Sequence, residues 1–443
     1  MMRAPALTFV AATFAALVSF VAPARAEIEI QTHTSPGGIE FWLVEEHSLP
    51  FLALDIIFKG GANLEPAEIR GATNLMMATL EEGSGDMDAR AFQAAREGLA
   101  ADFGYDAYDD SVSVSARVLT ENRDEALALL RQSILEPTFD QVAVDRVRGQ
   151  VLAGIASDAV RPNSIAGETF WSMAYPDHPY GSDMDGTVET VNALTPEDLE
   201  QVRQAVLTRE RIAVGAVGDI TADELGPLLD DLLGDLPEEA PELTPEAPYD
   251  LAGGVTVVPF ETPQSVAIFA QAAPERDSDD FFAVYVLNHI LGGGGFESRL
   301  MDEVREKRGL TYGIGTSIVN RDQTDLWIGS VASGNATIAE AVEVTRGVWA
   351  EVAQNGVTQE ELDAAKTYIT GEYPLRFDGN GTIAGILAGM QYIGLGPEYV
   401  TERNGFVEAV TLEDVNRAAR EWMDPDALRF VVVGQPEGLE STD

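Results

Sequence analysis

Two stretches in different halves of the chain repeat each other in a constant register. A Thr followed by acidic residues opens a predicted helix at Thr195 and again at Thr411, and each helix leads into a short apolar strand that ends at Gly218 or Gly434. A Thr N-cap with acidic residues in the first turn is a typical helix start. The offset between the copies is the same, 216 residues, at the Thr and at the Gly. A constant register over a helix and a strand predicts two halves with the same fold.

A Pro- and Glu-rich stretch, 236–252, lacks apolar periodicity and predicts an extended linker between the halves. It separates an N-terminal domain over 27–235 from a C-terminal domain over 253–436. In both domains predicted strands precede runs of helices, as with the alternating stretch 111–118 and the helical spacing of 122–135. This order is typical of the α+β class. We therefore expect two homologous halves, each an antiparallel sheet with helices on one face.

The first 26 residues have the features of a secretory signal peptide. An apolar run follows Arg3 and ends in the small-residue pattern Ala24-x-Ala26, which is typical of a cleavage site. We therefore expect a periplasmic or secreted protein. The alternative is an uncleaved anchor, because the run is nearly long enough to span a bilayer.

Composition narrows the possible functions. The chain has no Cys, which excludes a disulfide framework and thiol chemistry. Its net charge of −46 argues against nucleic acid or an anionic membrane as a partner. The same charge can attract basic peptides, or it can reflect general solubility or adaptation to a salty medium.

Five stretches of the chain carry motifs that occur together in one family of peptidases. They are Gly60–Pro66, Gly71, His178–Gly181, Leu194–Leu199 and Leu291–Tyr312. In these motifs, which are spread over essentially the whole chain after residue 26, the protein resembles the insulinase, pitrilysin and mitochondrial processing peptidase family of inverted zinc peptidases. The resemblance implies a clamshell made of the two α+β halves.

The metal-binding motif of that family is altered in this chain. The family carries His-x-x-Glu-His on one helix and a further Glu ligand on a later helix, so that the Glu between the two His activates a zinc-bound water. Here the matching positions are Asn74 and Ala78 for the two His, Met77 for the base, and Gly154 for the last ligand. Met and Ala cannot hold zinc in a hydrolytic site, and Asn is a poor substitute for His. The resemblance thus implies no metal on this chain and zinc in a partner subunit.

Other potential ligands do not form a recognisable metal site. The chain has four histidines, and no two of them lie at ligand spacing: His33, His47, His178 and His289. Glu81 and Glu82 follow the altered motif, but two carboxylates without His rarely make a catalytic zinc site, so a solvated helix end is the simpler interpretation. An active enzyme with unorthodox metal ligation remains the weakest of the alternatives.

Arg308 and Tyr312 are the strongest candidates for function. The resemblance implies that this pair reaches toward the zinc site of another domain, binds the substrate backbone and helps to hold the oxyanion. An Arg fork and a Tyr hydroxyl are suitable donors for that role. The alternative is that Arg308 caps the negative end of its helix and Tyr312 packs in the core.

The glycine run 292–295 lacks the Gly-Lys-Ser/Thr of a phosphate loop, so nucleotide binding is not expected. The resemblance to the non-catalytic subunit of the processing peptidase implies that Gly293 and Gly294 bind substrate. Glycines allow such close backbone approach. A helix C-cap followed by a turn is the alternative.

Together these features predict a chain that is inactive alone. Our hypothesis is a non-catalytic, substrate-binding subunit of a two-component periplasmic zinc peptidase, paired as a heterodimer with a His-x-x-Glu-His homologue and acting on peptides or unfolded polypeptides. The alternative is a stand-alone peptide-binding or scaffolding protein.

Overall fold

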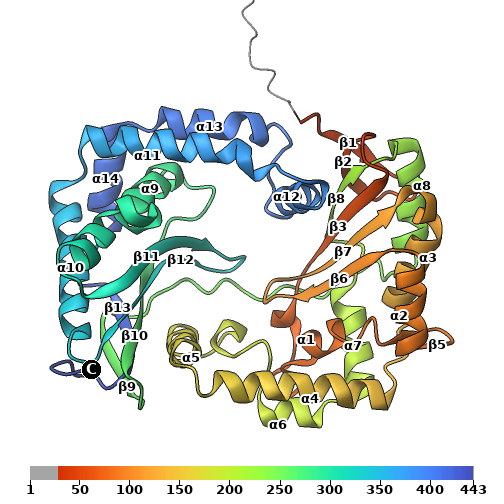
Figure 1. Cartoon of the computed structure of the whole chain (residues 1–443), viewed down its shortest axis with the longest axis horizontal. Helices are drawn as coiled ribbons and strands as arrows, with labels where there is room; N and C mark the ends of the chain where they lie inside the picture. Colours follow the sequence, from red (N-terminus) through yellow and green to blue (C-terminus); the bar gives the residue numbers. More distant parts are fainter. Residues whose placement is uncertain (1–27, 443) are drawn as a thin grey trace, which may run out of the picture.

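The computed structural model describes residues 28–442 and contains two large sheets, one in each half of the chain (Figure 1). The predicted signal peptide, 1–26, lies outside the described residues. Within those residues no helix is both long and apolar enough to cross a membrane.

The N-terminal sheet has six strands. In spatial order they are β1 (Gln31–Thr34), β2 (Glu40–Glu45), β8 (Ile212–Gly218), β3 (Phe51–Lys59), β7 (Ser111–Leu119) and β6 (Asp102–Ala107). Its helices are α1 (Ala72–Met77), α2 (Ala89–Gly98), α3 (Arg123–Leu135), α4 (Gln141–Asp158), α5 (Pro162–Ala174), α6 (Val188–Ala193), α7 (Pro196–Val206) and α8 (Ala222–Leu233). A small hairpin, β4 (Gly83–Ser84) and β5 (Met87–Asp88), follows α1.

The C-terminal sheet has five strands. In spatial order they are β11 (Thr311–Asn320), β12 (Asp325–Gly334), β10 (Gln264–Ala272), β13 (Arg429–Gly434) and β9 (Gly254–Pro259). Its helices are α9 (Phe281–Asn288), α10 (Ile338–Asn355), α11 (Gln359–Glu372), α12 (Asn380–Tyr392), α13 (Tyr399–Ala409) and α14 (Leu412–Trp422). Short helical turns occur in both halves: η1 (Ala62–Leu64), η2 (Ala67–Ile69), η3 (Thr120–Asn122), η4 (Pro179–Gly181), η5 (His289–Gly293), η6 (Gly295–Glu297), η7 (Met301–Glu306) and η8 (Tyr373–Arg376).

The internal repeat is confirmed in three dimensions. Thr195 opens α7 and Thr411 opens α14, each with a reciprocal capping box to an Asp three residues later. The strands that follow, β8 and β13, occupy matching places, and each ends in a glycine with nearly the same backbone angle (Gly218 φ +153°, Gly434 φ +154°). The predicted α+β class is also confirmed.

Each sheet is antiparallel except for one pair. β8 runs parallel to β2, and β13 runs parallel to β9. The prediction of purely antiparallel sheets was therefore wrong at one pair in each half. The physical reason is the connection: the last strand of each half returns beside an early strand, β2 or β9, after intervening helices, and such a crossover permits parallel pairing.

Helices cover both faces of each sheet, and one of the two layers comes from the other half of the chain. α12, which belongs to the C-terminal half by sequence, packs on β8 and β3 of the N-terminal sheet. Conversely, α5 packs on β10 and β13 of the C-terminal sheet. The sequence predicted helices on one face only. This exchange holds the halves together, with residues 239–252 running between them without helix or strand.

α12 lies unusually close to β8 because Gly215 has no side chain. A Cβ at Gly215 would lie 2.1 Å from the carbonyl oxygen of Ala384 and 2.8 Å from the Ala388 nitrogen. The pairing of β2 with β8 begins at Gly215, so Val214 has no partner on β2, and the Gln391 side-chain amide donates to the carbonyl oxygen of Val214 at 2.8 Å. An amide of α12 thus satisfies a carbonyl that has no partner on β2.

We expect Gly215→Ala to destabilise the protein, because its methyl group would displace α12 from the sheet. Overpacking of this kind costs about 1–3 kcal/mol. The measurement is the urea midpoint of unfolding. The matched control is Gly389→Ala in α12, where an added Cβ meets nothing within 4 Å, and where Ala favours the helix by about 1 kcal/mol. Equal midpoints for the two variants would contradict this account of the packing.

Candidate functional site

The helix that would carry the metal site, α1, is held in place by three residues that we call the α1 frame: Glu65, Arg70 and Gly71. The Glu65 carboxylate accepts from the backbone nitrogens of Gly71 (3.1 Å) and Thr73, so it neutralises the positive end of α1. Gly71 has φ +100°, a conformation that favours glycine. The resemblance motif at Gly60–Pro66 therefore has a structural role that does not depend on metal.

The metal-ligand positions of α1 carry no metal chemistry. Asn74 donates its side-chain amide to the Asp185 carboxylate at 2.8 Å, and Met77 is buried in the core of the N-terminal half. Ala78 is exposed, and Gly154 lies on α4, which packs against α1. Over residues 28–442, no three His, Cys, Asp or Glu side chains are placed to hold a metal ion. These residues do not fit a zinc ion.

The Asp185 carboxylate contacts the first position of the altered motif, Asn74. Burial raises its pKa, and the nearby Asp183 and Asp158 carboxylates raise it further. The Asp185 carboxylate accepts a hydrogen bond from the side chain at the first ligand position, Asn74. In zinc sites, a carboxylate in this relation orients the ligating imidazole.

Glu81 and Glu82 do not form the solvated helix end that the sequence predicted. Arg96 pairs with Glu81 at 2.6 Å, and Arg146 pairs with Glu82. Both carboxylates are partly buried and engaged in ion pairs, so neither is free to bind metal.

The histidines lie in separate places, and each has its own local contact. His33 contacts Gln31, His47 lies between Asp219 and Glu45, His178 accepts from the Tyr180 nitrogen, and His289 packs its ring against Tyr368.

Arg308 and Tyr312 lie on either side of the turn between η7 and β11. Arg308 donates to the Glu303 carbonyl oxygen (2.7 Å) and to its carboxylate (2.5 Å), so it does cap the helix end. Tyr312 is 88% exposed, and the alternative that it packs in the core is wrong. The register of β11 shifts between Thr311 and Ile314, which places Tyr312 in a bulge. Such bulges redirect side chains away from the sheet.

The glycine run lies beside the same strand. A Cβ at Gly292 would lie 2.5 Å from the Thr316 side-chain oxygen, so this glycine permits close packing of η5 on β11. Gly293 is exposed and Gly294 is half-buried. The glycine run therefore ends the helical turn η5, as the alternative of a helix end followed by a turn predicted. Substrate binding by Gly293 and Gly294 stays a prediction.

Phe296 and Arg305 were missed by the sequence analysis. Phe296 is 69% exposed, and the Arg305 guanidinium lies over its ring at 4.5 Å. The available signal was Phe296 itself, because a large aromatic side chain directly after a glycine run is expected to lie on a loop.

The junction between the halves was also missed. We use the term interdomain junction for the turn 108–110 between β6 and β7, the turn 321–324 between β11 and β12, and the side chains that join them. Arg321 pairs with Asp109 at 2.7 Å, and the Tyr180 hydroxyl donates to the Asp110 carboxylate at 2.7 Å. Tyr180 belongs to the His-Pro-Tyr-Gly landmark, which was the available signal.

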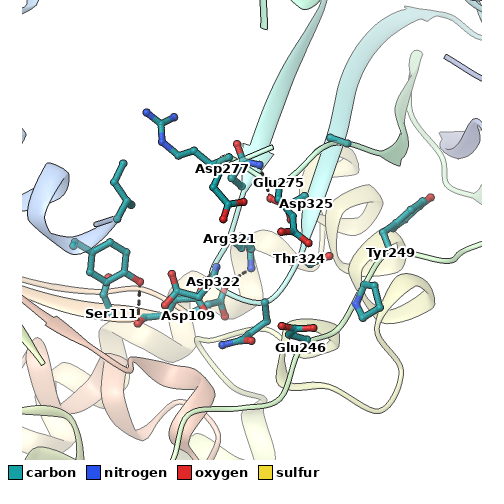
Figure 2. A pocket seen from close by; sticks show the side chains of 18 of the residues that line it. Asp109, Ser111, Glu246, Tyr249, Glu275, Asp277, Arg321, Asp322, Thr324 and Asp325 are labelled. Atoms are coloured by element: carbon teal, nitrogen blue, oxygen red, sulfur yellow. Dashed lines mark hydrogen bonds and ion pairs between the residues drawn. The ribbon is translucent and has the colours of Figure 1, made fainter. Parts of the chain in front are cut away.

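A cavity of about 1180 Å³ opens at this junction (Figure 2). Its walls come from both halves and from the linker. They include Lys59, Tyr108, Asp109, Asp110, Glu246, Tyr249, Glu275, Arg276, Asp277, Arg321, Asp322, Asp325, Tyr392 and Trp422.

Restoring the three ligands should restore metal binding, because the α1 frame is intact. We expect Asn74→His/Ala78→His/Gly154→Glu to retain about one zinc per chain after dialysis, as measured by elemental analysis. Asp185 is placed to orient the first imidazole, and a Cβ at Gly154 meets nothing within 4 Å. Asn74→His alone is the control and should retain none. A folded triple variant that holds no more zinc than the control would show that the frame is not set for metal.

Comparison with known proteins identifies the family. Residues 42–188 match the insulinase family (peptidase family M16), and residues 193–369 match the peptidase M16 inactive domain. The non-peptidase homolog YmxG of Helicobacter pylori is 24% identical over 390 residues, covering 88% of this chain and 90% of that protein. An uncharacterized zinc protease of Mycobacterium leprae is 25% identical over 404 residues, covering 88% of both chains.

Solved structures agree with this assignment. A crystal structure of a peptidase M16 inactive domain from Pseudomonas fluorescens superposes with a TM-score of 0.86 and 29% identity, covering 93% of this chain and 99% of that one. A protease from Helicobacter pylori has the same fold, with a TM-score of 0.81 and 16% identity over 91% of this chain and 99% of that one. This chain belongs to the peptidase M16 (insulinase) family.

Proposed function

We propose that this chain is the non-catalytic, substrate-binding subunit of a two-component zinc peptidase. The observation that carries the proposal is a contrast between the halves. The N-terminal half keeps the α1 frame but has Asn74, Met77 and Ala78 at the reactive positions. The C-terminal half presents Tyr312 at 88% exposure, beside Arg308.

The pair would serve a metal site on a partner that carries His-x-x-Glu-His. A Tyr hydroxyl and an Arg fork can each donate to a substrate carbonyl whose oxygen gains negative charge during hydrolysis. Arg308 is already neutralised by the Glu303 carboxylate, whose pKa is lowered by hydrogen bonds from Lys307 and Arg308. A bound peptide would therefore have to draw Arg308 away from Glu303, or share it.

Substrate would lie along the glycine loop and an exposed strand edge. Gly293 and Gly294 lie next to β11, which is the edge strand of its sheet. An extended peptide can add to such an edge through backbone hydrogen bonds, while nearby side chains provide selectivity. Exposed Phe296 is suited to contact an apolar side chain of that peptide.

The second candidate is a stand-alone peptide-binding or scaffolding protein. The contact between Arg308 and Glu303 favours it, because Arg308 already has a structural partner within its own turn. In this second proposal the same loop and strand edge hold a peptide, but no partner supplies metal.

The proposed location is the periplasm, or outside the cell, and the proposed partner is a zinc-bearing homologue from the same organism. The support for the location is the sequence of residues 1–26, with its apolar run and Ala24-x-Ala26. Cell fractionation with mass determination of the mature N-terminus tests this part.

Mixing with a His-x-x-Glu-His homologue should generate hydrolysis of a quenched fluorescent peptide library that chelators abolish. In the mixture, Arg308→Ala and Tyr312→Phe should each lower kcat/KM by about 10²-fold, the usual effect of removing one oxyanion donor. Lys307→Ala is the matched control, because Lys307 lies in the same turn and pairs with Asp302 and Glu303.

Unchanged activity in both variants would assign the pair to structure and favour the scaffold. Chelator-sensitive hydrolysis by this chain alone would contradict both proposals.

A further inference from the structure

The cavity at the interdomain junction lies well away from the pair proposed to serve the partner. Tyr312 is near the start of β11, whereas Asn320 and Arg321 at its other end line the cavity. Eight residues of extended strand separate Tyr312 from Asn320, which is about 27 Å. A ligand in this cavity would not occupy the Arg308–Tyr312 surface.

Seven carboxylates and three cationic side chains line the cavity. Two of the cations are already paired inside it: Arg321 with Asp109 at 2.7 Å and Lys59 with Asp322 at 3.0 Å. The third, Arg276, lies over the rings of Phe281 and Tyr399 and donates to the Tyr399 hydroxyl at 3.0 Å. The positive charge of Arg276 therefore lies against the rings of Phe281 and Tyr399.

Five of the cavity carboxylates have no cationic partner within 4 Å among residues 28–442. One of them, Asp110, accepts hydrogen bonds from the Tyr180 hydroxyl and the Asn63 amide. The other four are Glu246, Glu275, Asp277 and Asp325. Figure 2 shows Glu275, Asp277 and Asp325 together on one side and Glu246 on the other. Burial raises the pKa of Asp325, and repulsion from Glu275 and Asp277 raises it further. A cation between these groups would relieve that repulsion.

The walls also carry aromatic side chains: Tyr108, Tyr249, Tyr392 and Trp422. The Lys59 ammonium already lies 5.2 Å from the centre of the Tyr392 ring, so one cation–π contact is present in the cavity. Faces of Tyr and Trp rings attract ammonium groups and also pack against alkyl chains. This lining suits a ligand with both ammonium groups and methylene segments.

The geometry does not suit a bare metal ion. No three carboxylate or imidazole groups of the described chain are close enough to coordinate one ion. The free carboxylates are instead spread over two sides of a space that is larger than most small-molecule pockets, which are roughly 300–1,000 Å³. A long and flexible cation can reach both sides, whereas a compact ion cannot.

We propose that this cavity binds a flexible chain bearing two or more primary ammonium groups, held by Glu275, Asp277 and Asp325 at one end and Glu246 at the other. A free polyamine and a Lys-rich peptide segment share this chemistry. Because the walls come from both halves and the linker, an occupant would also strengthen the contact between the halves.

The test is calorimetric titration of the full chain with spermidine and, separately, with acetyl-Lys-Gly-Lys-amide. We expect one site per chain, and we expect Glu275→Gln/Asp277→Asn to weaken it at least about tenfold, since two charge contacts are lost. Glu246→Gln should weaken it less. The control is Glu97→Gln/Asp231→Asn, which changes the net charge equally through exposed side chains on α2 and α8.

The tighter of the two ligands identifies the source of the ammonium groups. Equal affinity in the cavity variant and in the control variant would mean that the acidic chain attracts cations without a site, and would overturn the proposal. Failure of both ligands to bind would also overturn it. Neither result bears on Arg308 or Tyr312, which these variants leave untouched.

Discussion

The Asp109 carboxylate lies between two guanidinium groups, one from each half of the chain. Arg70 contacts one of its oxygens at 3.2 Å, and Arg321 from the other half contacts the second at 2.7 Å. The Arg70 side chain is only 5% exposed and also donates to the carbonyl oxygens of Ala62, Pro179, Ser182 and Asp183. Removing one member of a buried ion pair costs about 3–5 kcal/mol, because it leaves an uncompensated charge.

This arrangement connects the altered metal helix to the rest of the molecule. Arg70 belongs to the α1 frame, and Arg321 lies at the tip of the β11–β12 hairpin whose other end carries Tyr312. The position of the exposed Tyr312 surface is therefore fixed relative to α1. The α1 frame can be retained after the metal ligands are lost, because Glu65, Arg70 and Gly71 support the junction even when no metal is bound.

Much of the fold could be predicted from sequence, because its signals are local. The Thr caps at 195 and 411, and the alternating stretch 111–118, are predicted from a few neighbouring residues, and each has the predicted structure. The altered metal-ligand positions were identified through the family resemblance. In the structure, Asn74 is hydrogen-bonded to Asp185 and Met77 is buried in the core. The exposure of Tyr312 could not be derived, because it depends on a bulge set by cross-strand register.

The features that sequence missed involve residues far apart in the chain. The packing of α12 on β8 depends on close approach at Gly215 to a helix some 170 residues later, and an isolated glycine in an apolar strand does not reveal its neighbour. The junction requires Asp109 to meet Arg321, and the cavity requires the linker to meet two hairpin turns. Charged residues in turns are usually solvated, so their composition alone did not indicate these contacts.

The central claim is that the surface around Arg308 and Tyr312 faces the metal of a partner. The chain has no Cys, so a single introduced thiol can carry a nitroxide label without competing sites. The measurement is the relaxation enhancement of a label at Lys307→Cys by cobalt bound in a His-x-x-Glu-His homologue, compared with a label at Val142→Cys on the exposed start of α4. The account predicts strong enhancement at 307 and weak enhancement at 142. Equal enhancement, or none at either position, would contradict it.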